Sequence, residues 1–173
     1  MKVTCIEYPI EQDWIACKAR ALVTVGLKVK NTPDDKWKHD ILKARHSPIR
    51  RLRFSFLFEG IPSWVSVHLA RHIHAQPYIK SQRNDRQDEY DRETAPQNAP
   101  VNMIYDVNAE ELMVVANKRL CSQAAEKTRQ VVRMMCNEVL KTNPEFKPFL
   151  VPMCQYLGEC KEMYPCNRGG CDE

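Results

Sequence analysis

The sequence has no long hydrophobic run, no block of like charge and only five glycines. A helix that crosses a bilayer needs about 20 consecutive apolar residues, so the chain offers no membrane partner through a spanning helix. Its start, MKVTCIEYPIEQDW, lacks the pattern of a signal peptide, which favours a cytoplasmic protein. The chain has 26 lysines and arginines against 22 aspartates and glutamates, a net charge of +4. This mild excess argues against nucleic acid as a partner and suits a small anionic ligand.

The length of 173 residues fits one domain, expected at 1–150, followed by a cysteine-rich C-terminal tail at 151–173. Apolar alternation predicts strands at 2–9 and 51–60, and helical spacing predicts helices at 11–25, 32–46 and 62–74. Thr32 is the expected cap of the second helix. The polar segment from 85 to 100 is predicted to be a loop, and this loop is expected to reach residue 106, just before the next helix. From Asn108 to 143 the spacing predicts one long helix, or two with a break near Ser122. Asn108 is its expected cap, and Glu111, three residues later, completes a variant of the capping box.

Residues 71–86, RHIHAQPYIKSQRNDR, concentrate arginine, lysine and histidine around a lone serine. If 62–73 is helical, one of its sides presents His68, Arg71 and His72. Ser81 and Arg83 reach the same side if the chain continues extended, and a hydroxyl beside guanidinium groups suits a phosphate. Two other interpretations are a solvated basic face and a metal site made of the histidines at 68, 72 and 74.

The order of these motifs resembles the flavin-dependent thymidylate synthases, the ThyX family. Their signature is Arg-His-Arg, seven residues and then Ser; here Arg71-His72 precedes Ser81 at that spacing, and Ser-x-Arg ends at Arg83. SP at 47–48, a phenylalanine-rich strand, NAEEL at 108–112 and Arg119 follow the same order over roughly 45–130. The resemblance implies an α+β fold, with a small, mostly antiparallel sheet flanked by helices and a long central helix.

The resemblance also implies a function: reductive methylation of dUMP to dTMP, with FAD reduced by NADPH and with methylenetetrahydrofolate as the carbon donor. It implies a homotetramer with sites shared between subunits. The implied FAD-binding residues are Ser47, Arg71, His72, Ile73 and Asn108. The implied dUMP-binding residues are His68, Arg71, Ser81, Gln82, Arg83 and Arg119. Arg119 is the implied catalytic residue, which assists ionisation of the pyrimidine. Positions 108 and 119 are eleven residues apart, close to three helical turns, so one helix face can serve both ligands.

Several residues depart from the family's pattern. Ile73 stands where the signature has its second arginine, Arg50 stands where glutamate is common, and Glu110 replaces an expected arginine. Arg45, Arg50 and Arg51 are candidates to replace the lost cations. The alternative function is a non-catalytic nucleotide-binding relative that has lost flavin chemistry.

The chain has eight cysteines, which in a cytoplasmic protein are expected to be thiols or metal ligands. Five, five and four residues separate the last four, a set that predicts zinc or an iron–sulfur cluster: Cys154, Cys160, Cys166 and Cys171. The alternatives are packed thiols or a redox-labile tail, and a third function is a metal-dependent nucleic-acid binder. The remaining cysteines, at 5, 17, 121 and 136, lie in apolar periodic segments and are predicted to belong to the core.

Overall fold

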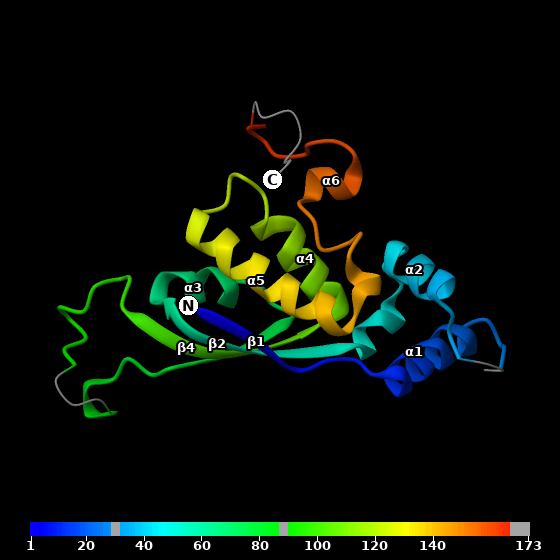
Figure 1. Cartoon of the computed structure of the whole chain (residues 1–173), viewed down its shortest axis with the longest axis horizontal. Helices are drawn as coiled ribbons and strands as arrows, with labels where there is room; N and C mark the ends of the chain where they lie inside the picture. The colour runs from blue at the N-terminus through cyan, green and yellow to red at the C-terminus, as the bar shows by residue number, and fades with distance from the viewer. Residues whose placement is uncertain (29–31, 87–89, 167–173) are drawn as a thin grey trace.

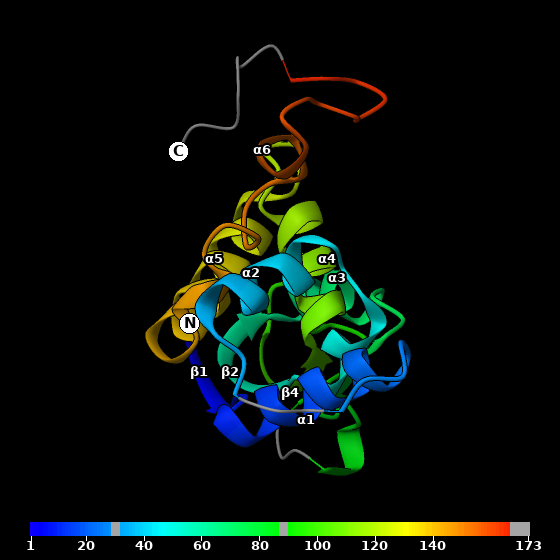
Figure 2. The same ribbon diagram turned by 90° about the vertical axis from the view of Figure 1, so that its right-hand side faces the viewer.

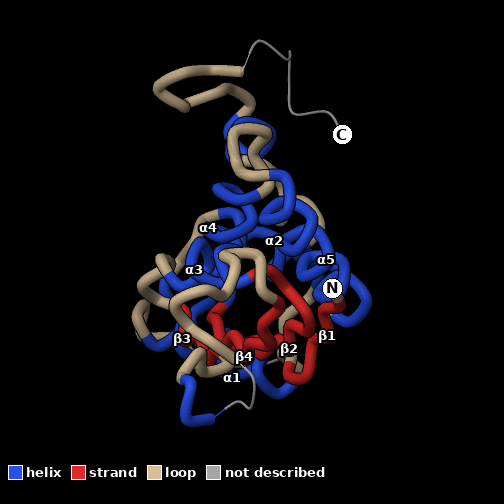
Figure 3. Tube along the Cα trace, turned by 90° about the vertical axis from the view of Figure 1, so that its left-hand side faces the viewer, coloured by secondary structure: helices blue, strands red, loops and turns tan. Residues whose placement is uncertain are grey.

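A computed structural model describes residues 1–28, 32–86 and 90–166 of the chain (Figure 1). The fold is α+β, as predicted. Its four-stranded sheet is antiparallel throughout, in the order β1-β2-β4-β3. The strands are β1 (Lys2–Glu7), β2 (Arg53–Pro62), β3 (Ala75–Ile79) and β4 (Pro100–Asn108). Helices α3, α4 and α5 lie together over one face of this sheet (Figures 1 and 3).

Strand β4 occupies a central place, between β2 and β3, and corrects the prediction of a loop up to residue 106. Its side chains alternate with period two, and the buried ones are Val101, Met103, Tyr105 and Val107. This pattern is the one expected of a strand with one buried face. The asparagines and the aspartate between these residues point away from the core, and they made the segment look like a polar loop.

The helices are α1 (Glu11–Val23), α2 (Asp35–Lys43), α3 (Ser63–Ala70), α4 (Ala109–Arg119), α5 (Glu126–Thr142) and α6 (Met153–Leu157). The region from 108 to 143 is therefore two helices, the second of the two possibilities. Helix α2 begins later than predicted, because Asp34 instead of Thr32 caps it, accepting a hydrogen bond of 2.8 Å from the Trp37 amide. No helix in the described ranges is long and apolar enough to cross a membrane.

The core lies between the sheet and the helices above it, and the end view shows the arrangement of these elements (Figure 2). Phe54, Phe56 and Phe58 of β2 are fully buried in it, and the Phe54 ring meets that of Phe146 edge to face at 5.3 Å. Burying such a side chain contributes about 1.5–3 kcal/mol each. This stack fixes the sheet as a base for the helices, in which α5 packs against both α3 and α4.

The opposite face of the sheet carries a cross-strand row of partly apolar side chains. Thr4 pairs with Leu57, Leu57 with Ile104, and Ile104 with Tyr78, so the row runs across all four strands. Tyr78 is 58% exposed, and Leu57 and Ile104 are half-buried. Of this row, Tyr78 is thus the apolar side chain most open to solvent.

The segment after residue 150 packs against the end of α4. The buried Asn117 amide donates hydrogen bonds to the carbonyls of Phe149 and Val151, at 3.1 and 2.6 Å. The Tyr156 hydroxyl donates to the Lys43 carbonyl at 3.0 Å. The division of the chain at residue 150 stays a prediction.

Candidate functional site

A chain of three polar side chains connects α4 with the end of α3. The Nδ1 of His72 lies 3.1 Å from a carboxylate oxygen of Glu111, and its Nε2 accepts a hydrogen bond of 3.1 Å from the Nε of Arg119. Arg119 also donates from Nη2 to the His68 carbonyl at 2.9 Å. The two contacts fix the tautomer of the imidazole, with the proton on Nδ1 facing the carboxylate.

This chain exists because α3 ends earlier than the sequence predicts. The helix stops at Ala70, Arg71 is its cap, and the His72 amide turns back to the Leu69 carbonyl at 3.1 Å. The expectation that His68, Arg71 and His72 share one side of a helix is therefore wrong. The turn instead buries His72, which is 9% exposed, and pushes Ile73 outward to 85% exposure.

The start of α4 supplies the carboxylate. Asn108 caps the helix as predicted, accepting a hydrogen bond of 3.0 Å from the Glu111 amide. A capping box would turn the Glu111 side chain back to the cap residue. Here that buried side chain reaches across to His72 instead, a role that the capping pattern in the sequence concealed.

Within the described part of the chain, Arg119 has no carboxylate partner. Its two acceptors, an imidazole nitrogen and a carbonyl, are neutral, and its pKa is lowered by burial and by the neighbouring Arg71. Among the described residues Arg71 makes no hydrogen bond or ion pair. The pKa of His72 is lowered mainly by burial and then by Arg119, whereas Glu111 acts to raise it. Two guanidinium groups without a carboxylate against either one make a place for an anion.

His68 contributes its backbone to Arg119 and its ring to a different surface. Its Nδ1 lies 2.9 Å from the Thr128 hydroxyl, and its ring packs edge to face on Trp64 at 5.3 Å. Burial and the two arginines lower the pKa of this histidine as well. The rings of His68 and His72 are thus both engaged by other side chains, which disfavours the three-histidine metal site.

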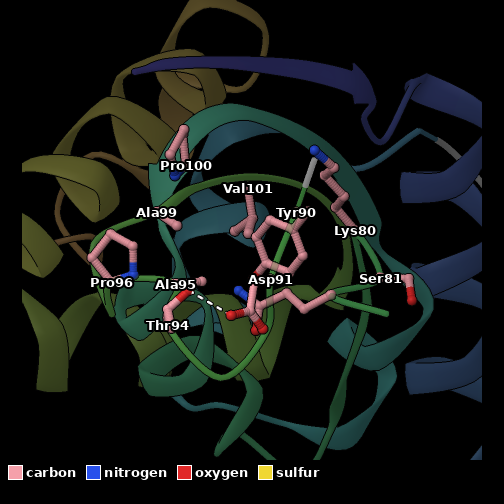
Figure 4. A pocket seen from close by; sticks show the side chains of 11 residues that line it. Lys80, Ser81, Tyr90, Asp91, Thr94, Ala95, Pro96, Ala99, Pro100 and Val101 are labelled. Atoms are coloured by element: carbon pink, nitrogen blue, oxygen red, sulfur yellow. Dashed lines mark hydrogen bonds between the residues drawn. The ribbon is translucent and has the colours of Figure 1, made fainter. Parts of the chain in front are cut away.

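The residues after β3 border other cavities. Ser81 and Gln82 line one of about 510 Å³ together with Lys80, Tyr90 and Asp91 (Figure 4). A neighbouring cavity of about 370 Å³ is lined by Gln82 and His68, among others. His72 and Arg119 line a third, of about 280 Å³. The structure thus brings His72 and Arg119 together at one cavity, and the His68 carbonyl contacts Arg119. Ser81 and Gln82 line other cavities, one of which Gln82 shares with His68, and Arg83 lines none of these three.

None of the residues of the segment 81–83 is without a partner. The Gln82 amide donates to the Ser63 hydroxyl at 3.0 Å. The exposed Arg83 makes two hydrogen bonds to the carboxylate of Asp85, at 2.9 and 2.6 Å. A phosphate at Arg83 has to displace or share that carboxylate.

The arginines near residue 50 are occupied by contacts within the chain. Arg50 forms an ion pair with Glu110, and Arg51 pairs with Asp13 at 2.9 Å. Arg45 donates to Asn117 and lies 4.5 Å from the centre of the Tyr156 ring. The suggestion that these three cations replace those lost from the signature therefore has no support in their contacts. Ser47, at the start of the short 3₁₀ helix η1 (Ser47–Arg51), is exposed.

Three of the four C-terminal cysteines predicted as metal ligands can be placed. Cys154, Cys160 and Cys166 border one small cavity, whereas Cys171 lies outside the described residues. The fourth cysteine at that cavity is Cys121, which the sequence assigned to the core. As they stand, no three His, Cys, Asp or Glu side chains in the described ranges form a ready metal-binding group.

No family model matches the sequence, and no curated protein matches it. The fold is that of the flavin-dependent thymidylate synthases, in line with the resemblance seen in the motifs. One similar structure is ThyX from Helicobacter pylori complexed with FAD and dUMP: TM-score 0.65, 16% identity, 80% of this chain and 93% of that one covered. A second structure of ThyX from the same organism, also with FAD and dUMP, gives a TM-score of 0.66 and 15% identity over the same shares.

Proposed function

We propose that the protein is a divergent flavin-dependent thymidylate synthase, which converts dUMP to dTMP with methylenetetrahydrofolate as carbon donor and NADPH as reductant. The observation that carries this proposal is the partly buried Arg119, held by neutral acceptors beside Arg71 and His72. It stands in a fold shared with enzymes that were solved with FAD and dUMP.

Arg119 is the residue proposed to act on the pyrimidine. A guanidinium group that lacks a carboxylate partner stabilises negative charge that develops on a bound ring, and partial burial strengthens that effect. His72 keeps the guanidinium in place through its Nε2, and Glu111 keeps His72 in the required tautomer. The role of the chain's own residues is therefore positioning and charge stabilisation, while FAD, when bound, supplies the hydride chemistry.

The phosphate of dUMP is assigned to the segment after β3. Ser81, the backbone of Gln82, and Arg83 offer a hydroxyl, an amide and a guanidinium, which together suit a phosphate. His68 and Gln82 line one cavity, so His68 can contact the nucleotide from the α3 side.

The residues assigned to FAD have donors that can meet it. Among the described residues, the Asn108 side-chain nitrogen, the Ser47 hydroxyl and the Arg71 guanidinium have no hydrogen-bond partner. FAD is rich in acceptors, so this donor set fits it. Ile73 supplies an exposed apolar surface at the same turn, although it lacks the charge of the signature arginine.

We place the complete site between subunits of a homotetramer. Ser81 and Arg119 line different cavities of one chain, so a second subunit is needed to bring a phosphate site next to a pyrimidine site. Val67, at the 370 Å³ cavity, Ile73, beside His72, and Tyr78, on the open face of the sheet, are exposed apolar residues that a second subunit can cover.

The alternative, a nucleotide-binding relative without flavin chemistry, is favoured by one observation. The three arginines near residue 50 are engaged within the chain, so none of them compensates for the charge that Ile73 lacks. Such a protein keeps the phosphate segment and Arg119 but does not retain FAD.

The first test is the visible spectrum of the purified protein before and after FAD is added and the excess removed. The synthase proposal expects retained flavin and formation of dTMP from dUMP, methylenetetrahydrofolate and NADPH. Arg119→Ala and the milder Arg119→Lys should lose dTMP formation, whereas Arg53→Ala, on an exposed part of β2, should keep it. A protein that binds dUMP but not FAD supports the alternative, and one that binds neither overturns both.

A further inference from the structure

Four cysteine side chains from two separate parts of the chain border one small cavity. Cys121 lies just after α4, Cys154 lies in α6, and Cys160 and Cys166 lie in the segment that follows α6. The cavity has a volume of about 10 Å³, close to the space that one water molecule needs. As they stand, no three side chains in the described part of the chain form a metal-binding group, but four cysteines around a space of that size supply enough ligands for one ion once their sulfurs move inward.

Other contacts hold the two parts together around this cavity. Lys118 pairs with Glu162 at 3.3 Å, and the Gln123 amide donates to the Tyr164 carbonyl at 2.9 Å. Both contacts join the end of α4 to the segment after α6, one on each side of Cys121 in the sequence. The cysteines are therefore brought together by the fold and not only by their spacing after residue 153.

We propose that Cys121, Cys154, Cys160 and Cys166 bind one zinc ion as a structural tetrathiolate site. Each thiol gives up its proton to solvent as its sulfur binds the metal, and tetrahedral coordination by four cysteines is a common structural zinc site. The volume suits a single ion better than an iron–sulfur cluster, which brings several irons and sulfides. Binding draws the four sulfurs inward and closes the segment around the ion.

The other described cysteines have surroundings that disfavour metal binding. Burial raises the pKa of Cys5 and of Cys17 to about 11, and that of Cys136 to about 12. A metal ligand has to be a thiolate, and apolar burial opposes that form. These thiols behave as small apolar side chains of the core, which makes Cys5 a suitable control.

The site has a consequence for the cavity that holds Arg119. Cys121, Gln123 and Glu162 line both the thiol cavity and the 280 Å³ cavity of His72 and Arg119. Zinc bound at the four thiols fixes one wall of that second cavity. Its role is structural, because none of the four sulfurs is assigned to substrate or flavin.

The test is metal analysis of the full chain, purified without a metal-binding tag. We expect one zinc per chain in the wild type and in Cys5→Ser, with little iron or sulfide. Cys121→Ser and Cys160→Ser should bind zinc at least about tenfold more weakly in competition with a chromophoric chelator, since loss of an outer partner alone can cost that much. Co²⁺ in place of zinc should give the charge-transfer and tetrahedral bands of thiolate coordination.

A further variant distinguishes the proposed ligand set from the set predicted by the sequence, which has Cys171 in place of Cys121. Cys171→Ser should keep its zinc, and if it loses zinc while Cys121→Ser keeps it, the proposed set is wrong. Iron with sulfide, or a metal-free chain whose thiols all react with a thiol reagent, also overturns the proposal. Bound zinc is measured independently of dTMP formation, so the test of the zinc site does not depend on the proposed function.

Discussion

Arg83, the residue proposed to hold the phosphate of dUMP, already has an anionic partner. Its guanidinium meets the Asp85 carboxylate through two parallel hydrogen bonds of 2.9 and 2.6 Å. Both side chains are more than half exposed, at 59% and 58%. The phosphate therefore competes with Asp85, so changes at the two residues should shift dUMP affinity in opposite directions.

The magnitude follows from the two interactions. A hydrogen bond to a charged group is worth about 1.5–3 kcal/mol, and an exposed ion pair about 0.2–1 kcal/mol. Arg83→Ala loses the hydrogen bonds to the phosphate but no longer has to break the ion pair with Asp85, a net loss of about 0.5–2.8 kcal/mol. That corresponds to roughly 2–110-fold weaker dUMP binding. Asp85→Asn removes the competitor and should tighten binding by up to about fivefold.

Calorimetric titration of dUMP into the flavin-loaded protein measures both effects. In the double variant Arg83→Ala/Asp85→Asn the gain from Asp85→Asn should vanish, because there is no guanidinium left to release. Arg53→Ala, which removes an exposed arginine elsewhere on the surface, should leave affinity unchanged. Unchanged affinity in Arg83→Ala, or weaker binding in Asp85→Asn, refutes the assignment of the phosphate to this segment.

Four other predictions follow from the contacts of single residues. From about pH 8 to about pH 5 the free energy of unfolding should decrease, because burial lowers the pKa of His72 in the folded state and the unfolded chain then binds the proton more readily. Urea unfolding of His72→Gln should show a shallower dependence, and an equal slope contradicts this. Asn117→Ala leaves one buried and one partly buried carbonyl without their donor and should cost about 2–4 kcal/mol in the same assay, whereas a loss below about 1 kcal/mol shows that other contacts hold the segment. Ile73→Arg, at an exposed position, should change stability by less than about 0.5 kcal/mol while raising the amount of FAD retained after gel filtration; no gain refutes the role given to the signature charge. Arg50→Glu and Glu110→Arg should each lower Tm, and the double variant should recover it; additive losses show that the pair is not coupled.

The fold class was predictable from motif order, because the phenylalanine-rich strand and the capped helix at Asn108 carry strong local signals. Strand β4 was not, since the polar residues between its buried ones resemble a loop, and only pairing on both sides shows that it is central. The end of α3 was also missed. An apolar-rich segment with good helical spacing gives no local sign that the chain turns after Ala70.

The sequence predicted most residues of the candidate site, but it did not predict the contacts between them. The sequence pointed to His72 and Arg119 separately, and the bond between their side chains depends on a turn and a helix that lie 47 residues apart in the chain. Glu111 was read as part of a helix cap, because spacing alone cannot tell which way a carboxylate turns. The pairing of Arg83 with Asp85 is local, and the order Arg-x-Asp could have indicated it.

The departures from the family's pattern are not all losses. Arg50 and Glu110, which stand where glutamate and arginine are expected, form an ion pair with each other, so the exchange of charge at one position is matched at the other. Charge is thus conserved across this contact between η1 and the start of α4, next to the cap residue assigned to the flavin. Ile73 has no such match, since the nearby candidate cations are bound elsewhere. Of these three departures, Ile73 is therefore the one left without a compensating change, an exposed apolar side chain in place of a charge.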